Sequence, residues 1–282
     1  MNHNLLIPFL IFILIFVFYI IFEYVFRQSV LKSISTKRDI SLPFITSFKW
    51  QPKWTVYLIL SPGLWVSENC KEFIKNEFPH NIIYKRELAN FIKASNFWNF
   101  IFSLSLLVVT LFREDILPEI NNSIFLAIVM WRYISRSFEI AIAFVRDVLS
   151  SDSKSSLDNH ARMKLAITSY FEIFIYSAAF YSAFSCKGET IFEPILTSLF
   201  VGTLTNISGA LELLINCCEY DLFYKSLLLL SVYLQVFATL SLIFFGFAGY
   251  LGRVKSNIKK STHSSLMRAY RKSRARYLPK HR

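Results

Sequence analysis

Residues 193–212 read EPILTSLFVGTLTNISGALE, an apolar run that begins next to a proline and ends among small polar residues. A helix that crosses about 30 Å of hydrocarbon needs about 20 apolar residues, so this run is too short to span a membrane. Runs of this length are typical of buried or re-entrant segments. Because it lies between two longer hydrophobic segments, 165–184 and 224–251, its surroundings decide the fold.

The composition of the whole chain indicates a membrane protein. Of the 282 residues, 54% are hydrophobic and 17% are aromatic, which is too apolar for an ordinary soluble domain. The formal net charge of +12 would favour nucleic acid binding in a soluble protein. In a membrane protein, however, lysine and arginine orient the helices, so the charge is informative loop by loop.

Five segments are expected to span the membrane. They are residues 5–26, 97–112, 124–145, 165–184 and 224–251. All but the third are apolar throughout most of their length, whereas 124–145 is apolar at both ends and contains charges inside. No small-residue cleavage site follows the first segment, so we expect a membrane anchor and not a removed signal peptide.

The charges of the loops alternate along the chain. Basic residues (Lys and Arg) outnumber acidic ones (Asp and Glu) by eleven to five in 27–97, by three to two in 148–164 and by eleven to none in 253–282. Acidic residues outnumber basic ones by three to one in 113–122 and by five to one in 186–223. Because positive loops remain cytosolic, five helices with an external N-terminus and a cytosolic C-terminus satisfy this tendency at every loop. The sequence therefore predicts an all-α, multi-pass protein of a plasma or inner membrane.

In this topology residues 193–212 lie on the outer side, between the last two spans. Pro194 suits the first turn of a helix, and Glu193 places negative charge at the positive end of the helix dipole. A helix of about 10 to 12 residues, too short to span, is then expected to end near 203–206. Non-helical backbone at membrane depth is tolerated where protein buries it or where it lines a water-filled cavity. The arrangement favours a pore, and the alternative is an apolar loop packed in the outer leaflet.

Two stretches resemble the pore-loop potassium channel family. Residues 203–210, TLTNISGA, are similar to the Thr-x-Thr-Thr-Val-Gly-Tyr-Gly filter of that family, and 233–253, YLQVFATLSLIFFGFAGYLGR, resembles the inner helix of bacterial two-helix channels. The resemblance covers about residues 162–253. In that family backbone carbonyls replace the hydration shell of the ion, and four subunits surround one axis.

The resemblance implies a homotetramer that passes monovalent cations. The filter-like residues would be Thr203, Thr205, Asn206, Ile207, Ser208 and Gly209, and the residues of a pore cavity or hinge would be Thr239, Gly246 and Gly249. The last two glycines would equally suit a helix packing face. Ser208 stands where the family has its first filter glycine, and the end of the motif is absent, so the filter is degenerate and potassium selectivity is not implied.

The third segment carries Arg132, Arg136, Glu139 and Arg146 on one helix face. Charges within a membrane are costly and usually face protein or water, so this network is a functional candidate. Arg136 is expected to pair with Glu139, three residues on, and Glu172 in the fourth segment is a second partner. We favour a charge-paired contact between these helices over a voltage sensor, because the arginines lack the regular spacing of every third residue.

Residues 27–97 predict a cytosolic or interfacial segment. Within it, 55–60 (TVYLIL) favours a strand, 61–63 (SPG) a turn, and the following residues a helix that begins at a Ser67 cap. Three tryptophans are expected at the lipid headgroups: Trp50, Trp54 and Trp65. A docking or regulatory module is the alternative.

The remaining features give few signs of chemistry. The basic tail 253–282 is expected to contact anionic lipids, and nucleic acid is not an expected partner. A disulfide from Cys186 to Cys217 or Cys218 would hold the loop, with free thiols as the alternative. Metal-binding, nucleotide-binding and catalytic motifs are missing from the sequence, so neither an enzyme nor a cofactor is predicted.

These predictions divide the chain into six parts. They are an anchor helix (1–26), a cytosolic or interfacial segment (27–97), a helical hairpin with buried charges (98–149), a cytosolic linker (150–164), a pore-loop module (165–252) and a basic tail (253–282). Passive cation movement is the expected function, with a nonconducting scaffold or sensor as the alternative. A transporter has less support, because the sequence shows no internal repeat of broken helices.

Overall fold

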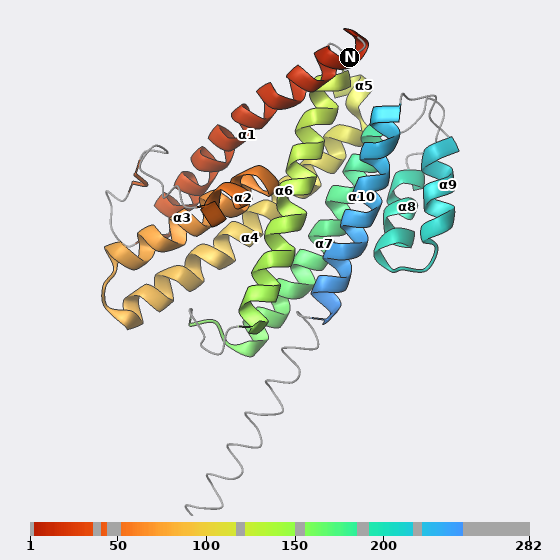
Figure 1. The fold of residues 1–282 in the computed structure, drawn as a ribbon. Helices are drawn as coiled ribbons and strands as arrows, with labels where there is room; N and C mark the ends of the chain where they lie inside the picture. The colour runs from red at the N-terminus through yellow and green to blue at the C-terminus, as the bar shows by residue number, and fades with distance from the viewer. Residues whose placement is uncertain are drawn as a thin grey trace, which may run out of the picture.

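The computed structural model describes residues 3–35, 41–43, 52–116, 122–149, 156–184, 192–216 and 222–244. These residues form ten helices and no strand, which confirms the predicted all-α class (Figure 1). The helices are α1 (His3–Ile34), α2 (Pro52–Leu60), α3 (Pro62–Glu77), α4 (Asn81–Leu111), α5 (Arg113–Ile116), α6 (Asn122–Leu149), α7 (Asn159–Phe184), α8 (Phe192–Gly202), α9 (Ile207–Asn216) and α10 (Leu222–Ser241).

Three helices are long and apolar enough to cross a membrane: Leu10–Ile34, Asn81–Leu111 and Lys225–Phe244. They belong to α1, α4 and α10. Helices α6 and α7, with 28 and 26 residues, are also long, but each contains charged residues. Three spans are therefore evident from length and composition, where the sequence predicted five.

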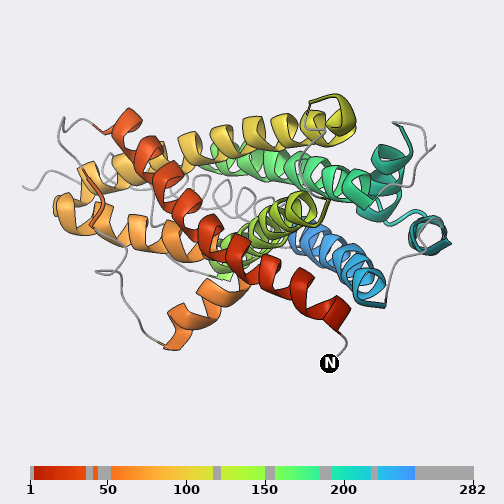
Figure 2. The same ribbon diagram turned by 90° about the horizontal axis from the view of Figure 1, so that it is seen from above.

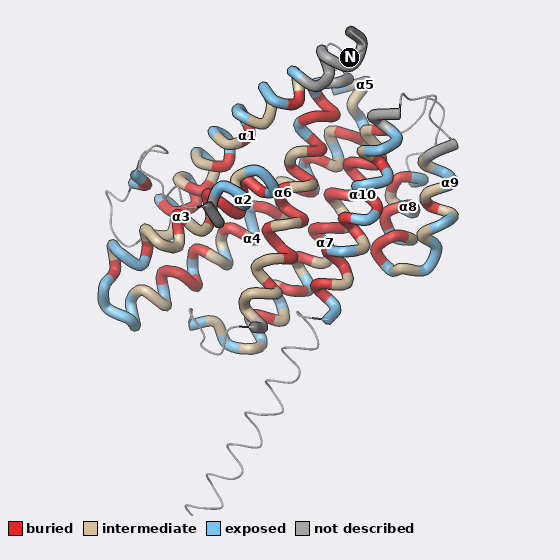
Figure 3. Tube along the Cα trace, viewed as in Figure 1, coloured by how far each residue is buried: buried red, intermediate tan, exposed pale blue. Residues whose placement is uncertain are grey.

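The distribution of polar and apolar side chains is typical of a membrane protein. On α1, Leu14 and Phe18 are 57% and 59% exposed, whereas Glu23 is completely buried. Figure 3 shows the same division along α4 and α10, with exposed residues facing outward and buried residues facing the bundle. A soluble protein places charges at its surface, so an apolar exterior around buried charges indicates a lipid environment.

The five long helices lie side by side (Figures 1 and 2). The central one is α6, which packs against α1, α7 and α10. Helices α6 and α7 are antiparallel, since Arg132 contacts Tyr176 and, at the other end of the pair, Asp147 forms an ion pair with Arg162. Aromatic side chains fill the apolar core between them. Packing of this kind, and not exclusion from water, holds helices together where lipid surrounds them.

Helix α10 completes this core. The Tyr133 hydroxyl of α6 donates to the Ser231 carbonyl at 2.7 Å, and the Tyr133 ring stacks on that of Phe180 with centroids 5.4 Å apart. Val232 of α10 is fully buried in the same cluster. The contacts place α10 against both α6 and α7.

The N-terminal third differs from the prediction. Helix α1 continues to Ile34 instead of ending at residue 26, and residues 55–60 are helical and not a strand. Helix α3 begins at Pro62 after a Ser61 cap, whose side chain accepts from Leu64 N at 3.1 Å. Ser67 lies inside the helix and is buried. The Ser-Pro pair is a strong helix start, whereas the strand preference of β-branched residues depends on context.

The tryptophans of this region are not arranged as predicted. Trp65 is 1% exposed and belongs to a core cluster with Val30, Leu31 and Cys70, so it does not reach the headgroups. Trp50 and the side chain of Trp54 lie outside the described residues. Buried contacts with α1 thus make α3 part of the helical bundle.

Candidate functional site

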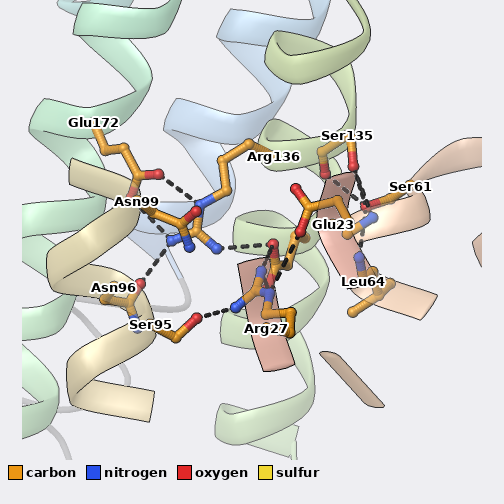
Figure 4. A network of polar contacts seen from close by, with 12 residues as sticks. Glu23, Arg27, Ser61, Leu64, Ser95, Asn96, Asn99, Ser135, Arg136 and Glu172 are labelled. Atoms are coloured by element: carbon orange, nitrogen blue, oxygen red, sulfur yellow. Dashed lines mark hydrogen bonds and ion pairs between the residues drawn. The ribbon is translucent and has the colours of Figure 1, made fainter. Parts of the chain in front are cut away.

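A network of charged side chains lies in the interior of the bundle, between α1, α4, α6 and α7 (Figure 4). It contains three arginines and three glutamates: Glu23, Arg27, Arg132, Arg136, Glu139 and Glu172. Each of these residues is at most 6% exposed. The formal charges of the six groups cancel, which lowers the cost of placing them in a low-dielectric interior.

Arg136 is the centre of the contact between α6 and α7. Its guanidinium bonds both carboxylate oxygens of Glu172, at 2.6 and 2.9 Å, and lies 2.9 Å from Glu139. It also donates to the Asn96 amide oxygen of α4 at 2.7 Å. Both predicted partners of Arg136 are therefore present, and the bidentate geometry is the strong form of this ion pair.

Arg132, one turn earlier on α6, binds three other helices. Its guanidinium forms an ion pair with Glu23 of α1, donates to the Tyr176 hydroxyl of α7 at 2.9 Å, and donates to the Asn99 side-chain oxygen of α4. The Phe102 ring lies beside it, with the centroid 4.8 Å from the guanidinium carbon. These partners fix Arg132 inside the bundle.

The α1 members of the network were missed in the sequence. Arg27 donates to both oxygens of Glu139, each at 2.8 Å, contacts Glu23 at 3.4 Å and bonds the Ser95 hydroxyl of α4. Because the first helix was expected to end at residue 26, Arg27 was assigned to the following loop. The feature that could have revealed them is Glu23, an acidic residue that lies within an apolar segment and four residues before an arginine.

The start of α3 lies against this network. Ser61 donates to the Ser135 carbonyl at 2.6 Å, and Gly63 N donates to the Ser135 hydroxyl at 3.0 Å. A Cβ on Gly63 would lie 3.3 Å from the carboxyl carbon of Glu23 and 3.3 Å from a carboxylate oxygen of Glu139. The positive end of the α3 dipole therefore lies close to two carboxylates.

A second polar region is the turn between α8 and α9, which form a helical hairpin. The Thr203 and Thr205 hydroxyls lie 2.9 Å apart, and Leu204 between them has a φ of 60°. Asn206 accepts from Gly209 N at 3.0 Å and so caps α9. Four polar residues of this region are exposed: Thr203, Thr205, Asn206 and Ser208.

Hydrogen bonds attach α8 to α7 and α10. The Ser198 hydroxyl lies 2.7 Å from that of Ser177 and donates to the Phe174 carbonyl at 2.8 Å. Gln235 of α10 donates to the Ser198 carbonyl at 2.8 Å and accepts from Tyr181 at 2.7 Å. All of these polar groups are internal to one chain, so the hairpin has a fixed position without a second subunit.

Close packing fixes the C-terminal end of α8. A Cβ on Gly202 would come within 2.2 Å of the Phe174 ring, and the Gly202 carbonyl accepts from the Tyr170 hydroxyl at 3.2 Å. A glycine is required here because the backbone of α8 lies directly against an aromatic side chain of α7.

The filter-like residues only partly have the conformation that their resemblance implies. Helix α8 ends at Gly202 and a polar turn follows, as predicted. Ile207, Ser208 and Gly209, however, form the first turn of α9. The Asn206 cap starts that helix, so these residues are not an extended strand of inward-facing carbonyls.

Other predicted residues are buried or outside the described part. Thr239 is 1% exposed within the chain, next to Ala238 in a cluster between α6, α7 and α10, so it does not line an open cavity. Gly246 and Gly249 lie outside the described residues. The same is true of Cys186, Cys217, Cys218 and the basic tail, residues 253–282.

Arg146 is separate from the buried network, near the Leu149 end of α6. It lies 2.8 Å from Glu68 of α3, whose other oxygen is 2.7 Å from Lys71. Burial alone would raise the pKa of Glu68, but Lys71 and Arg146 outweigh it and hold this pKa below its ordinary value. Among the described residues, His, Cys, Asp and Glu side chains form no group of three that could hold a metal ion.

No protein-family model, curated protein or solved structure matches this chain. The two polar regions are therefore interpreted from their own geometry. One is a charge network closed within the bundle, and the other is an exposed polar turn on a short helical hairpin.

Proposed function

We propose that this chain is a channel-like membrane protein with five spanning helices, in which α8 and α9 form a re-entrant hairpin beside a cation pathway. Helices α6 and α7 are the two further spans. Their charges do not prevent insertion, because Arg132, Arg136, Glu139 and Glu172 are paired within the network. Lipid would then meet mainly the apolar outer faces of the bundle.

The depth of the α8–α9 turn carries this proposal. Gly202, the last residue of α8, contacts Tyr170 and Phe174, which lie at the middle of α7. If α7 spans the membrane, the turn lies near the midplane. A helix of 11 residues is about 16 Å long, which is half of a bilayer's hydrocarbon thickness.

The exposed groups at that depth favour an aqueous surface. Hydroxyl and amide groups facing hydrocarbon without a partner cost several kcal/mol each, roughly 2–7 by transfer measurements. Thr203 and Asn206 also bond within the chain, but exposed hydroxyl and amide groups keep further hydrogen-bonding positions. The exposed side chains of Thr203, Thr205, Asn206 and Ser208 are therefore better placed against water or a neighbouring subunit. The C-terminal end of α8 carries partial negative charge, which attracts cations and not anions.

A single hairpin cannot enclose a pathway, so the proposal includes assembly of several copies. Four copies around one axis is the arrangement that the pore-loop resemblance implies. The external N-terminus, the cytosolic basic tail and its contact with anionic lipids belong to the same proposal, and the loop charges support them. Chemical cross-linking of the protein in membranes would count the subunits.

Planar bilayer recordings of the purified protein test the pathway. Replacing both Thr203 and Thr205 with alanine is expected to lower cation conductance about fivefold, since a lost hydroxyl contact is worth about 1 kcal/mol. Ser105→Ala is the matched control, because Ser105 is exposed, bonds its own helix at the Ile101 carbonyl, and belongs to α4 and not to the hairpin or the helices that hold it. Equal currents in all three proteins, or none from folded oligomers, would reject a pathway at this turn.

The second candidate is a nonconducting scaffold or sensor. The helical conformation of Ile207, Ser208 and Gly209 favours it, because helical carbonyls bond within α9 and are not free to replace a hydration shell. The same recordings separate the two functions. A well-folded monomer without current would support the scaffold.

A further inference from the structure

One order of helices occurs twice in the chain: a long helix, then a pair of shorter helices, then a second long helix. The first unit is α1, α2, α3 and α4, and the second unit is α7, α8, α9 and α10. Helix α6 lies between the two units in the bundle and packs against α1, α7 and α10 (Figure 2). The sequence showed no internal repeat of broken helices, so this order is evident only from the structure.

The contacts establish the directions of the long helices. Helices α1 and α6 are parallel, because Phe12 contacts Trp131 and, further along both helices, Arg27 pairs with Glu139. Helix α4 is parallel to α7, since Arg136 bonds both Asn96 and Glu172 and, one turn later, Tyr176 donates to the Asn99 carbonyl. Helix α7 is antiparallel to α6, so α1 and α7 run in opposite directions.

Helix α10 is antiparallel to α7. Near the Phe184 end of α7, Tyr181 bonds Gln235, whereas Ala166, close to the other end of α7, shares a cluster with Leu242. The second unit therefore has the same order as the first unit with every long helix reversed. Such inverted repeats are a known construction of membrane proteins, with the short interrupted helices meeting near the midplane.

The break between α2 and α3 reaches the same depth as the α8–α9 turn. Ser61 and Gly63 bond Ser135, and Ser135 lies at the middle of α6, as Tyr170 and Phe174 do in α7. The two short pairs start from opposite ends of the bundle. One follows the Ile34 end of α1 and the other follows the Phe184 end of α7, and these ends are opposite because α1 and α7 are antiparallel.

Helix α2 has the side chains of a segment in lipid. Val56 and Ile59 are 52% and 61% exposed, while Tyr57 and Leu58 on the other face pack on a core cluster that includes Val30 of α1 and Trp65 of α3. Helix α1 packs on the same cluster through Tyr24 and Phe26, and its Phe18 and Val25 side chains are exposed. An apolar outer face at mid-depth, on a helix that packs on the same cluster as the spanning helix α1, fits hydrocarbon chains and not water.

We propose that α2 and the start of α3 form a second re-entrant segment, which enters the membrane from the face opposite to the α8–α9 hairpin and contacts lipid acyl chains through Val56 and Ile59. Residues 52–77 are then not a cytosolic domain. This inference rests on the proposed spanning of α6 and α7, but it does not depend on conduction. Inverted repeats with interrupted helices are common in secondary transporters, so this arrangement also favours a transporter as the function of the chain.

Depth-dependent fluorescence quenching tests the proposal. A polarity-insensitive fluorophore is attached to Ile59→Cys in a protein whose Cys186, Cys217 and Cys218 are replaced by serine, reconstituted in vesicles. Cys70 can remain, because it is completely buried and a thiol-labelling reagent does not reach it in the folded protein. Lipids brominated near the middle of the acyl chain and aqueous iodide on both sides are the two quenchers.

Two matched positions calibrate the result. Phe18→Cys on the outer face of α1 is the lipid reference, and Ile82→Cys at the start of α4, where Ile82 is 85% exposed, is the water reference. The Ile59 label is expected to match Phe18, with quenching by bromolipid about threefold stronger than by iodide, as for a group inside the hydrocarbon layer. Val56→Cys provides a second label should Ile59→Cys fail to fold.

The outcomes separate this inference from the proposed function. Iodide quenching of both α2 labels at the level of Ile82 would overturn the re-entrant segment, whatever the conductance. Bromolipid quenching in a protein that carries no current would retain the segment and reject the channel. Phe18 labels without bromolipid quenching would show that the bundle does not span, and both proposals would fail together.

Discussion

The charge network and the α8–α9 turn are both polar regions that lie beside the middle of α7, yet they differ in the exposure and the partners of their polar groups. In the network, each of six charged residues is at most 6% exposed and has partners on neighbouring helices. At the turn, Thr203, Thr205 and Asn206 also have partners within the chain, but they and Ser208 are exposed and can bind further groups. A polar group whose partners are all within the chain serves stability, whereas an exposed one at membrane depth needs water, an ion or another subunit.

The largest effect is expected from removing a charge in the network. Arg136→Met leaves Glu172 without both of its bonds to the guanidinium, and an uncompensated buried charge costs about 3–5 kcal/mol. Thermal or denaturant unfolding in detergent measures the loss. Arg146→Met on the same helix is the control, because Arg146 is 40% exposed and a surface ion pair is worth about 1 kcal/mol or less.

A double variant sharpens this result. Arg136→Met with Glu172→Gln removes both charges, so the free energy of unfolding should recover by a large part of the loss, while Glu139 keeps Arg27. Equal destabilisation by the single and the double variant would mean that lost packing and not unpaired charge dominates. The network would then resemble any other part of the core.

A smaller effect is expected where the hairpin meets α7. Gly202→Ala forces the Phe174 ring to move, since a Cβ would come within 2.2 Å of it, and overpacking of this kind costs about 1–3 kcal/mol. The variant is expected to unfold at a lower temperature and to loosen α8, which protease cleavage in the turn would report. Adding Phe174→Leu makes room and should restore stability. No recovery would indicate that the backbone of α8 and not the ring contact is limiting.

The sequence predicted the partners of Arg136 on α6 and α7, but not the members of the network on α1 and α4. The spacing of Arg132, Arg136 and Glu139 placed them on one face, and pairing to Glu172 followed from the need to neutralise charge. Glu23 and Arg27 could not be assigned in the same way, because nothing in a hydrophobic pattern tells which helix is the neighbour. The α4 partners Ser95, Asn96 and Asn99 depend on the same tertiary information.

The hairpin shows a similar limit. The short apolar run and its polar end predicted α8 and the turn at 203–206, since composition alone excludes a span. The helix after the turn was missed because Asn206 was assigned to a filter, although Asn is a strong helix cap. Thr239 was assigned to a cavity from its position on the inner helix, yet the face that a helix turns to its neighbours depends on packing.

A modest effect is expected from the cap of α9. Asn206→Ala removes the side-chain acceptor for Gly209 N, and loss of a cap costs about 1 kcal/mol. Hydrogen exchange of the α9 amides should therefore quicken about fivefold, while that of α7 stays unchanged. Ser208→Ala, an exposed neighbour, is the control and should leave these amides within about twofold. Equal protection in both variants would contradict the capping role of Asn206.

The smallest effect concerns Glu68, which has charged partners as the network glutamates do but lies near the bundle's end. Its pKa is lowered in the folded protein by Lys71 and Arg146 despite burial. The resulting stability is present above the ordinary carboxyl pKa, about 4.3, and is lost as the pH falls through the lower folded value. Because Arg146 is 40% exposed, solvent screening limits the gain to about 0.5 kcal/mol. Glu68→Gln should therefore slightly flatten the fall of the free energy of unfolding with pH below about pH 4.3. Identical pH profiles for both proteins would show that this outer ion pair adds nothing, and stability would then depend on the buried network alone.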